Sequence, residues 1–207
     1  MSQQAALYLK LIVNQHWSVE RSVSDSLKPF SVQNKENSGS LNGQQRLEDE
    51  ISSHDKHTLK QEIFGALDNV VHLTDAHNKV IISSIENIIY NIAQLEYASW
   101  AAYAQQQILQ RLTQPDERYQ MSGLRALKSI FQAFEFEINE ERQPLHKLID
   151  NFFPVLESLL QSDALQNSPN YVPLMIHIAK IFFMSVQVSE YQLSHICLIT
   201  ILERSLD

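Results

Sequence analysis

The sequence predicts an all-α fold built as a solenoid of antiparallel helix pairs, and three observations support this prediction. Gly and Pro are scarce, at 4 and 6 of 207 residues, while helix-forming residues are abundant. Apolar residues recur at three- and four-residue spacing through most of the chain. One short stretch also recurs at intervals of about 35 to 50 residues, once a polar segment near the N-terminus is set aside, which is typical of stacked repeats.

The recurring stretch is clearest at residues 127–136, which read Leu-Lys-Ser-Ile-Phe-Gln-Ala-Phe-Glu-Phe. Similar stretches lie at residues 9–17, 89–97 and 179–188, and each is predicted to end an amphipathic helix. Four residue pairs mark the same register: Leu9-Lys10, Tyr90-Asn91, Leu127-Lys128 and Ala179-Lys180.

The first predicted helix covers residues 3–17. Its inward face is Ala6, Leu9, Ile12 (or Val13) and His16. From residue 18 to residue 55 the periodicity is lost and Ser, Asn and Gly dominate. Such a composition buries too little apolar surface to offset the entropy of ordering, so we expect residues 18–55 to be a disordered polar insertion.

Two further helices are predicted over residues 57–72 and 76–95, with Thr74 and Asp75 as capping residues between them. Their inward faces are Leu59, Ile63, Leu67 and Val70 in the first, and Ile81, Ile85, Ile88, Ile92 and Leu95 in the second, widened by Ile82 and Ile89. The many isoleucines also suit a strand, but the three- to four-residue spacing holds over four turns and favours a helix.

A second predicted pair covers residues 98–112 and 115–137, and Pro115 is placed at the start of the second helix of this pair. The predicted inward residues are Trp100, Ala104, Ile108 and Leu112, followed by Leu124, Leu127, Phe131 and Phe134.

The last predicted pair covers residues 140–162, capped by Asn139, and residues 170–188, which follow a Ser168-Pro169 start signal. Pro154 predicts a kink in the first of these helices. The inward residues are Leu145, Leu148, Phe152, Leu156 and Leu159, then Val172, Met175, Ile178, Phe182 and Val186. A final helix is expected from Ser189 through Leu193, Ile196 and Thr200.

Two helices per repeat at these lengths fit a HEAT/armadillo-like α-α superhelix, a right-handed solenoid. In this scheme residues 1–17 are the second helix of a truncated HEAT repeat. Residues 18–55 are the insertion, and residues 56–207 are HEAT repeats of which the last is incomplete.

The formal charge of −8 disfavours direct nucleic-acid binding, which needs a basic surface, and suits basic protein partners. Cys197 is the single cysteine, so no intramolecular disulfide is possible and an intracellular setting is expected. The sequence has no signal peptide and no apolar run near the roughly 20 residues of a membrane span, so no membrane insertion is expected.

No residue is predicted to be catalytic, to bind a cofactor or to bind a metal. The run from His54 through Asp55 and Lys56 to His57 has metal-like residue types but lacks zinc spacing. The remaining candidates have a structural interpretation: His72 and His77 at helix ends, Cys197 in the core, Glu135, Glu137, Glu140 and Glu141 around a helix turn, and Lys10 and Lys128 as solvated flank residues.

Several segments resemble, in order and spacing, the importin-β superfamily of nuclear transport receptors. They are Gln4–Lys10 closing at Trp17, Tyr97–Trp100, Ser122–Leu127, Glu140–Leu145 and Phe152–Leu156, the last two being most similar to the importin-seven and importin-eight branch. Leu11 and Ala98 depart from the family's usual Asn and Pro. The resemblance covers most of the chain outside residues 18–55 and implies an N-terminal fragment of a larger receptor.

The resemblance implies a HEAT-repeat receptor that shuttles between cytoplasm and nucleus through the pores of the nuclear envelope. It implies three partners: the small GTPase Ran in its GTP form, protein cargo of basic character, and phenylalanine-glycine nucleoporins. The inner helices would be residues 3–16, 76–95, 115–137 and 170–188. The alternative is a generic HEAT-repeat scaffold or adaptor without Ran binding, and neither function is enzymatic.

Overall fold

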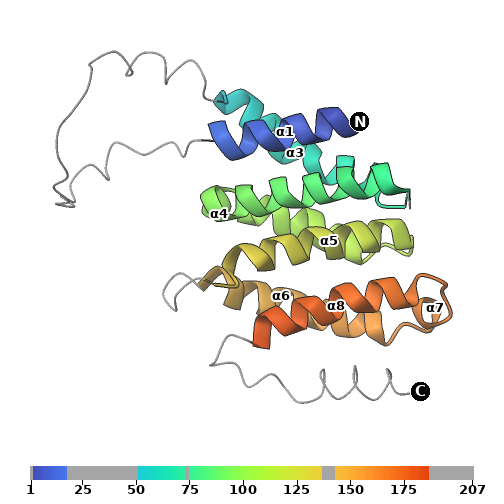
Figure 1. The fold of residues 1–207 in the computed structure, drawn as a ribbon. Helices are drawn as coiled ribbons and strands as arrows, with labels where there is room; N and C mark the ends of the chain where they lie inside the picture. The colour runs from blue at the N-terminus through green and yellow to red at the C-terminus, as the bar shows by residue number, and fades with distance from the viewer. Residues whose placement is uncertain (1, 18–50, 73–74, 137–142, 187–207) are drawn as a thin grey trace, which may run out of the picture.

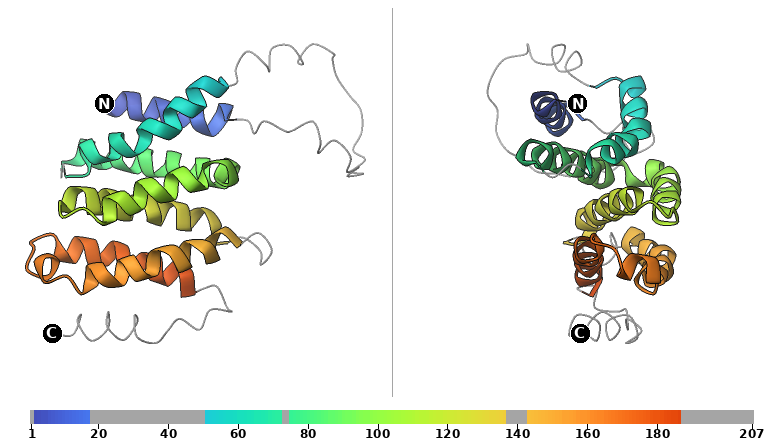
Figure 2. Two further views of the ribbon diagram at one scale, coloured as in Figure 1. Left: turned by 180° about the vertical axis from the view of Figure 1, so that it is seen from behind. Right: turned by 90° about the vertical axis from the view of Figure 1, so that its right-hand side faces the viewer.

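The computed structural model describes residues 2–17, 51–72, 75–136 and 143–186, which form helices and turns with no strand among them. The chain alternates between two layers (Figure 1). The front layer stacks α1 (Gln3–His16), the first half of α4 (Ala76–Leu112), α5 (Glu117–Phe134) and α8 (Tyr171–Val186). Behind it, the back layer holds α3 (Ser53–Val70), the second half of α4 and α6 (Gln143–Leu160) (Figure 2). The all-α prediction is confirmed.

The recurring stretches of the sequence all belong to the front layer. Residues 9–17 lie at the end of α1, residues 89–97 at the end of the first half of α4 and residues 127–136 at the end of α5, while the described part of the fourth stretch, residues 179–186, ends α8. The self-similarity of the sequence therefore follows one stack of neighbouring helices.

The two predicted helices 76–95 and 98–112 are both present, joined end to end at a kink, and together carry the label α4. Glu96 alone leaves the helical range, with φ −141° and ψ 25°, and bends α4 from the front layer into the back layer. The sequence has no Pro or Gly at this point, so the helix turns without a loop.

Helix starts follow short polar side chains. Ser52 and Asp75 cap α3 and α4 by accepting from the backbone N–H groups of Asp55 and Asn78, at 3.1 and 2.9 Å. Because Ser52 is an ordered cap, the predicted insertion 18–55 is too long at its C-terminal end. Asp116 caps α5, so Pro115 precedes the cap instead of opening the helix.

The C-terminal pair follows the prediction in part. α6 contains Pro154 in its interior, as expected, and the kink at this residue stays a prediction. A short helix, α7 (Asp163–Gln166), follows it, and α8 then begins at Tyr171 instead of directly after Ser168-Pro169. The predicted Asn139 cap and the final helix from Ser189 lie outside the described residues.

Most predicted inward residues are buried between the layers, including every one assigned to residues 98–112, 115–137 and 140–162. Aromatic contacts join the layers: the Phe64 and Trp100 rings are 5.5 Å apart, and those of Phe153 and Phe182 are 4.5 Å apart. Each fully buried large apolar side chain contributes roughly 1.5–3 kcal/mol to folding.

Two residues that were predicted to face inward are exposed. Leu95 is 42% exposed because the bend at Glu96 turns it outward, and Val172 is 63% exposed because Leu174 takes the inward position at the start of α8. Phe136, the last residue of the recurring stretch, is 83% exposed because α5 has already ended at Phe134.

A polar cluster joins three helices inside this apolar packing. Asp68 of α3 accepts from Arg111 of α4 at 2.9 and 2.6 Å, and also from the Ser122 hydroxyl of α5. Gly123, the next residue of α5, lies so close to α4 that an added Cβ would sit 3.0 Å from the Leu112 side chain. The chain therefore needs a small residue where α5 crosses the end of α4.

Candidate protein-binding face

The front layer carries a row of polar side chains that link neighbouring helices. Between α1 and α4, His77 Nδ1 donates to Gln3 Oε1 at 2.7 Å, and the Asn91 amide donates to Asn14 and, at 3.2 Å, to Asn87. These contacts lie at or near the surface, so they leave polar groups accessible along the face. A face of this kind suits a partner protein, since it spreads binding over several helices.

Between α4 and α5 the row continues as an ion cluster. Glu86 Oε1 lies 3.0 Å from Arg125 Nη1 and 3.1 Å from Lys128 Nζ. The Lys128 side chain is only 12% exposed, which corrects its interpretation as a solvated lysine. Two cations share this one carboxylate, so the cluster keeps an excess of positive charge.

Between α5 and α8 the row ends at His177 and Lys180. His177 is 8% exposed, and burial, followed by the charges of Arg125, Lys128 and Lys180, lowers its pKa to about 3. Its imidazole is therefore neutral near pH 7, whereas Lys180 is exposed and charged.

The bend in α4 is held by a second ion cluster. Glu96 accepts from the Trp17 indole at 3.1 Å and from Lys60, and Lys56 Nζ lies 3.9 Å from the same carboxylate. Both lysine ammonium groups also lie over the Trp17 ring, at 5.6 and 5.8 Å from its centroid. The cluster ties the end of α1 and the start of α3 to the residue where α4 changes layer.

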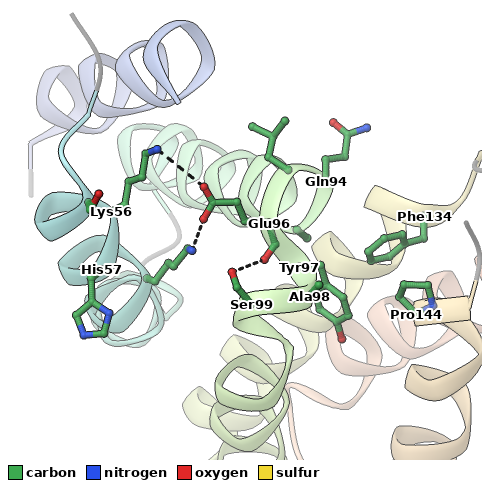
Figure 3. A pocket seen from close by; sticks show the side chains of 13 residues that line it. Lys56, His57, Gln94, Glu96, Tyr97, Ala98, Ser99, Phe134 and Pro144 are labelled. Atoms are coloured by element: carbon green, nitrogen blue, oxygen red, sulfur yellow. Dashed lines mark hydrogen bonds and ion pairs between the residues drawn. The ribbon is translucent and has the colours of Figure 1, made fainter. Parts of the chain in front are cut away.

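A hollow of about 680 Å³ opens beside this bend (Figure 3). Glu96 points from α4 toward Lys56, and the Ser99 hydroxyl donates to the Glu96 carbonyl at 3.0 Å. Burial raises the pKa of Tyr97, on the same wall, to about 12, although a hydrogen bond from Gln105 opposes this shift. Its hydroxyl stays protonated near neutral pH, and the charged groups are engaged with each other. This arrangement favours a structural role.

The residues singled out in the sequence are dispersed. Asp55 is engaged at the Ser52 cap and Lys56 at Glu96, while His54 and His57 are exposed. In the described ranges no three His, Cys, Asp or Glu side chains are grouped to hold a metal ion.

The histidines predicted at helix ends lie there: His77 in the first turn of α4 and His72 just after α3. Lys10 is half-buried on α1, and Glu135 caps the end of α5. The remaining candidates, Glu137, Glu140, Glu141 and Cys197, lie outside the described residues.

Sequence reasoning missed the clusters around Glu86 and Glu96 because their members are far apart in the chain. The only available signal was that Lys128 falls in the recurring register, one helix away from Glu86.

Among the described residues, no helix combines the length and apolarity that spanning a bilayer requires.

Comparisons of the chain with family models, curated proteins and solved structures find no match.

Proposed function

We propose that this chain is part of an importin-like nuclear transport receptor, which carries protein cargo through the nuclear pore and releases it under the control of Ran-GTP. The observation that carries the proposal is the position of the resembling segments. Trp17, Trp100 and Gly123, which belong to three of these segments, lie at contacts between helices, where a repeat architecture depends on residue identity.

Three of these positions support the proposal. Trp17 closes α1 and donates its indole N–H to Glu96 at the bend of α4. Trp100 is 2% exposed and stacks on Phe64 just after that bend. Gly123 allows the close approach of α5 to Leu112. Each residue belongs to a resembling segment, and each has a packing reason to be where it is.

The front layer supports the assignment of inner helices. The four helices expected to face Ran and cargo are α1, the first half of α4, α5 and α8, and these four lie side by side (Figure 2). A stack of helices binds partners over an extended surface without a catalytic pocket. Release would follow from differential affinity, with Ran-GTP and cargo favouring different curvatures of the stack.

The proposal is tested by measuring binding of Ran loaded with a non-hydrolysable GTP analogue or with GDP to the immobilised chain. We expect measurable, weak binding of the GTP form and a smaller signal for the GDP form. Equal binding of both forms, or no binding of either, would reject the receptor and leave the generic helical scaffold.

A pair of matched variants locates the binding face. Ser83→Arg places a bulky charge on the exposed face of α4 in the front layer, whereas Gln106→Arg places the same charge on its exposed second half. Binding of Ran-GTP should weaken in the first variant only. Equal loss in both would show that the front layer is not the binding face.

A further inference from the structure

The seam between α5 and α8 concentrates positive charge on an acidic protein. Arg125 and Lys128 are three residues apart on α5, and His177 and Lys180 are three residues apart on α8, so each pair shares one helix face. Glu86 is the one carboxylate that the described residues place in ion-pair contact with Arg125 and Lys128. Two cations therefore share one carboxylate and the exposed Lys180 adds a third positive charge on α8, although the whole chain carries a formal charge of −8.

Two buried polar atoms at this seam have no hydrogen-bond partner among the described residues: Arg125 Nε and His177 Nδ1. Buried polar atoms in folded proteins are nearly always partnered, by protein groups or by ordered water, so these two atoms give the seam hydrogen-bonding capacity that its own side chains do not use. His177 is neutral for the reasons given above, and it would stay so until an anion offsets the surrounding cations.

The seam opens at one end into a hollow of about 720 Å³, whose walls include Arg125, Lys79 and Met121. On its rim Asp116 is paired with Arg118, and the neutral Asn170 amide donates to Glu117 at 2.6 Å. The lining holds three cations, Lys79, Arg118 and Arg125, against these two carboxylates, so positive charge exceeds negative charge by one.

Apolar side chains accompany the cations on α8. Val172 and Ile176, one helical turn apart, are 63% and 48% exposed, and Phe183 is 66% exposed further along the helix. A ligand that fits this surface combines negative groups with apolar side chains. An acidic peptide has this chemistry, whereas a nucleic acid supplies the negative phosphates but no aliphatic side chains to cover Val172 and Ile176.

We propose that the α5–α8 seam binds an acidic peptide segment of a partner protein, with a Glu or Asp carboxylate held between Arg125, Lys128 and Lys180. Charge-assisted hydrogen bonds to the lysines and the guanidinium orient the carboxylate. Apolar side chains of the same segment cover Val172 and Ile176. This inference goes beyond the receptor proposal and does not depend on Ran binding.

The test uses fluorescence anisotropy with the whole chain and a labelled 15-residue peptide in which Glu and Leu are interspersed. A peptide with Lys in place of every Glu and a single-stranded RNA of equal charge serve as competing probes. The double variant Lys128→Gln/Lys180→Gln removes two cations from the seam. Lys147→Gln removes one exposed cation from α6 in the back layer and is the control.

We expect saturable binding of the Glu peptide that weakens with added salt, and about tenfold weaker binding by the double variant. Lys147→Gln should bind like the wild type. The inference is overturned by equal affinities of the double variant and Lys147→Gln, by preference for the Lys peptide or the RNA, or by no saturable binding. Circular dichroism shows whether the variants keep their helical fold. The peptide affinity of Lys180→Gln alone is a second test, because Lys180 is exposed.

Discussion

Replacing Asp68 with alanine should lower the free energy of unfolding by about 3 kcal/mol. Asp68 and Arg111 are 13% and 9% exposed at their side chains, and the carboxylate receives both arms of the guanidinium at 2.9 and 2.6 Å. Removing one partner of a buried ion pair typically costs about 3–5 kcal/mol because the other charge stays buried. The backbone and side-chain oxygens of Gln107 still accept from Arg111, at 3.0 and 2.8 Å. We therefore expect a loss of stability at the low end of this range.

The assay is urea unfolding followed by circular dichroism, with thermal unfolding as a check. A loss of 3 kcal/mol should lower the Tm by roughly 6–12 °C in a chain of this size. The control is Arg118→Ala, which removes the exposed Arg118–Asp116 pair, 51% and 41% exposed, and should change stability by less than about 1 kcal/mol.

A double-mutant cycle decides whether the pair itself is responsible. Asp68→Ala combined with Arg111→Met leaves neither buried charge unpaired, so the double variant should be more stable than the sum of the single losses by about 1–3 kcal/mol. Additivity within about 0.5 kcal/mol would refute the reasoning, because the two side chains would then stabilise the fold independently.

Three other predictions use the same unfolding assay. Gly123→Ala should lower the free energy of unfolding by about 1–3 kcal/mol because the added Cβ would press on Leu112. Gly65→Ala, where the added Cβ meets open space, should leave stability unchanged or raise it by up to about 1 kcal/mol. Equal effects of the two substitutions would contradict the packing argument. Glu96→Gln should cost about 1–3 kcal/mol because Lys60 and the Trp17 indole lose the carboxylate that they share, and a loss insensitive to salt would speak against this cause. Between pH 7 and pH 5 the wild type should lose about 2 kcal/mol more of its free energy of unfolding than His177→Leu does. The pKa of His177 is about 3 in the folded state and 6.5 in the unfolded state, so only the unfolded state takes up a proton in this range. Parallel pH profiles of the two proteins would show that this histidine does not titrate on unfolding.

Helical periodicity was enough to predict most of the packing, because buried faces such as Trp100, Ala104, Ile108 and Leu112 repeat at the spacing of a helix. It failed where the backbone itself departs from regular spacing. The bend at Glu96 exposes Leu95, and the late start of α8 exposes Val172. No single residue type marks either departure in the sequence.

The ion clusters were beyond sequence reasoning for a different reason. Glu86 and Lys128 are 42 positions apart, and Asp68 and Arg111 are 43 positions apart, so their contacts depend on which helices become neighbours. The recurring register predicted that the helices carrying Lys10, Asn91, Lys128 and Lys180 are equivalent, and they do share the front layer. It did not predict which acidic residue each cation meets.

A hydrogen bond holds together the residues that flank residues 18–50. The Ile51 backbone N–H donates to the His16 carbonyl at 3.3 Å, so the chain leaves α1 and re-enters before α3 at neighbouring points. The entropy of closing such a loop changes by only about 0.6 kcal/mol for each doubling of its length. A short glycine-serine linker, an affinity tag or a fluorescent domain can therefore replace residues 18–50 while α1 and α3 keep their places, which gives a site for labelling the protein.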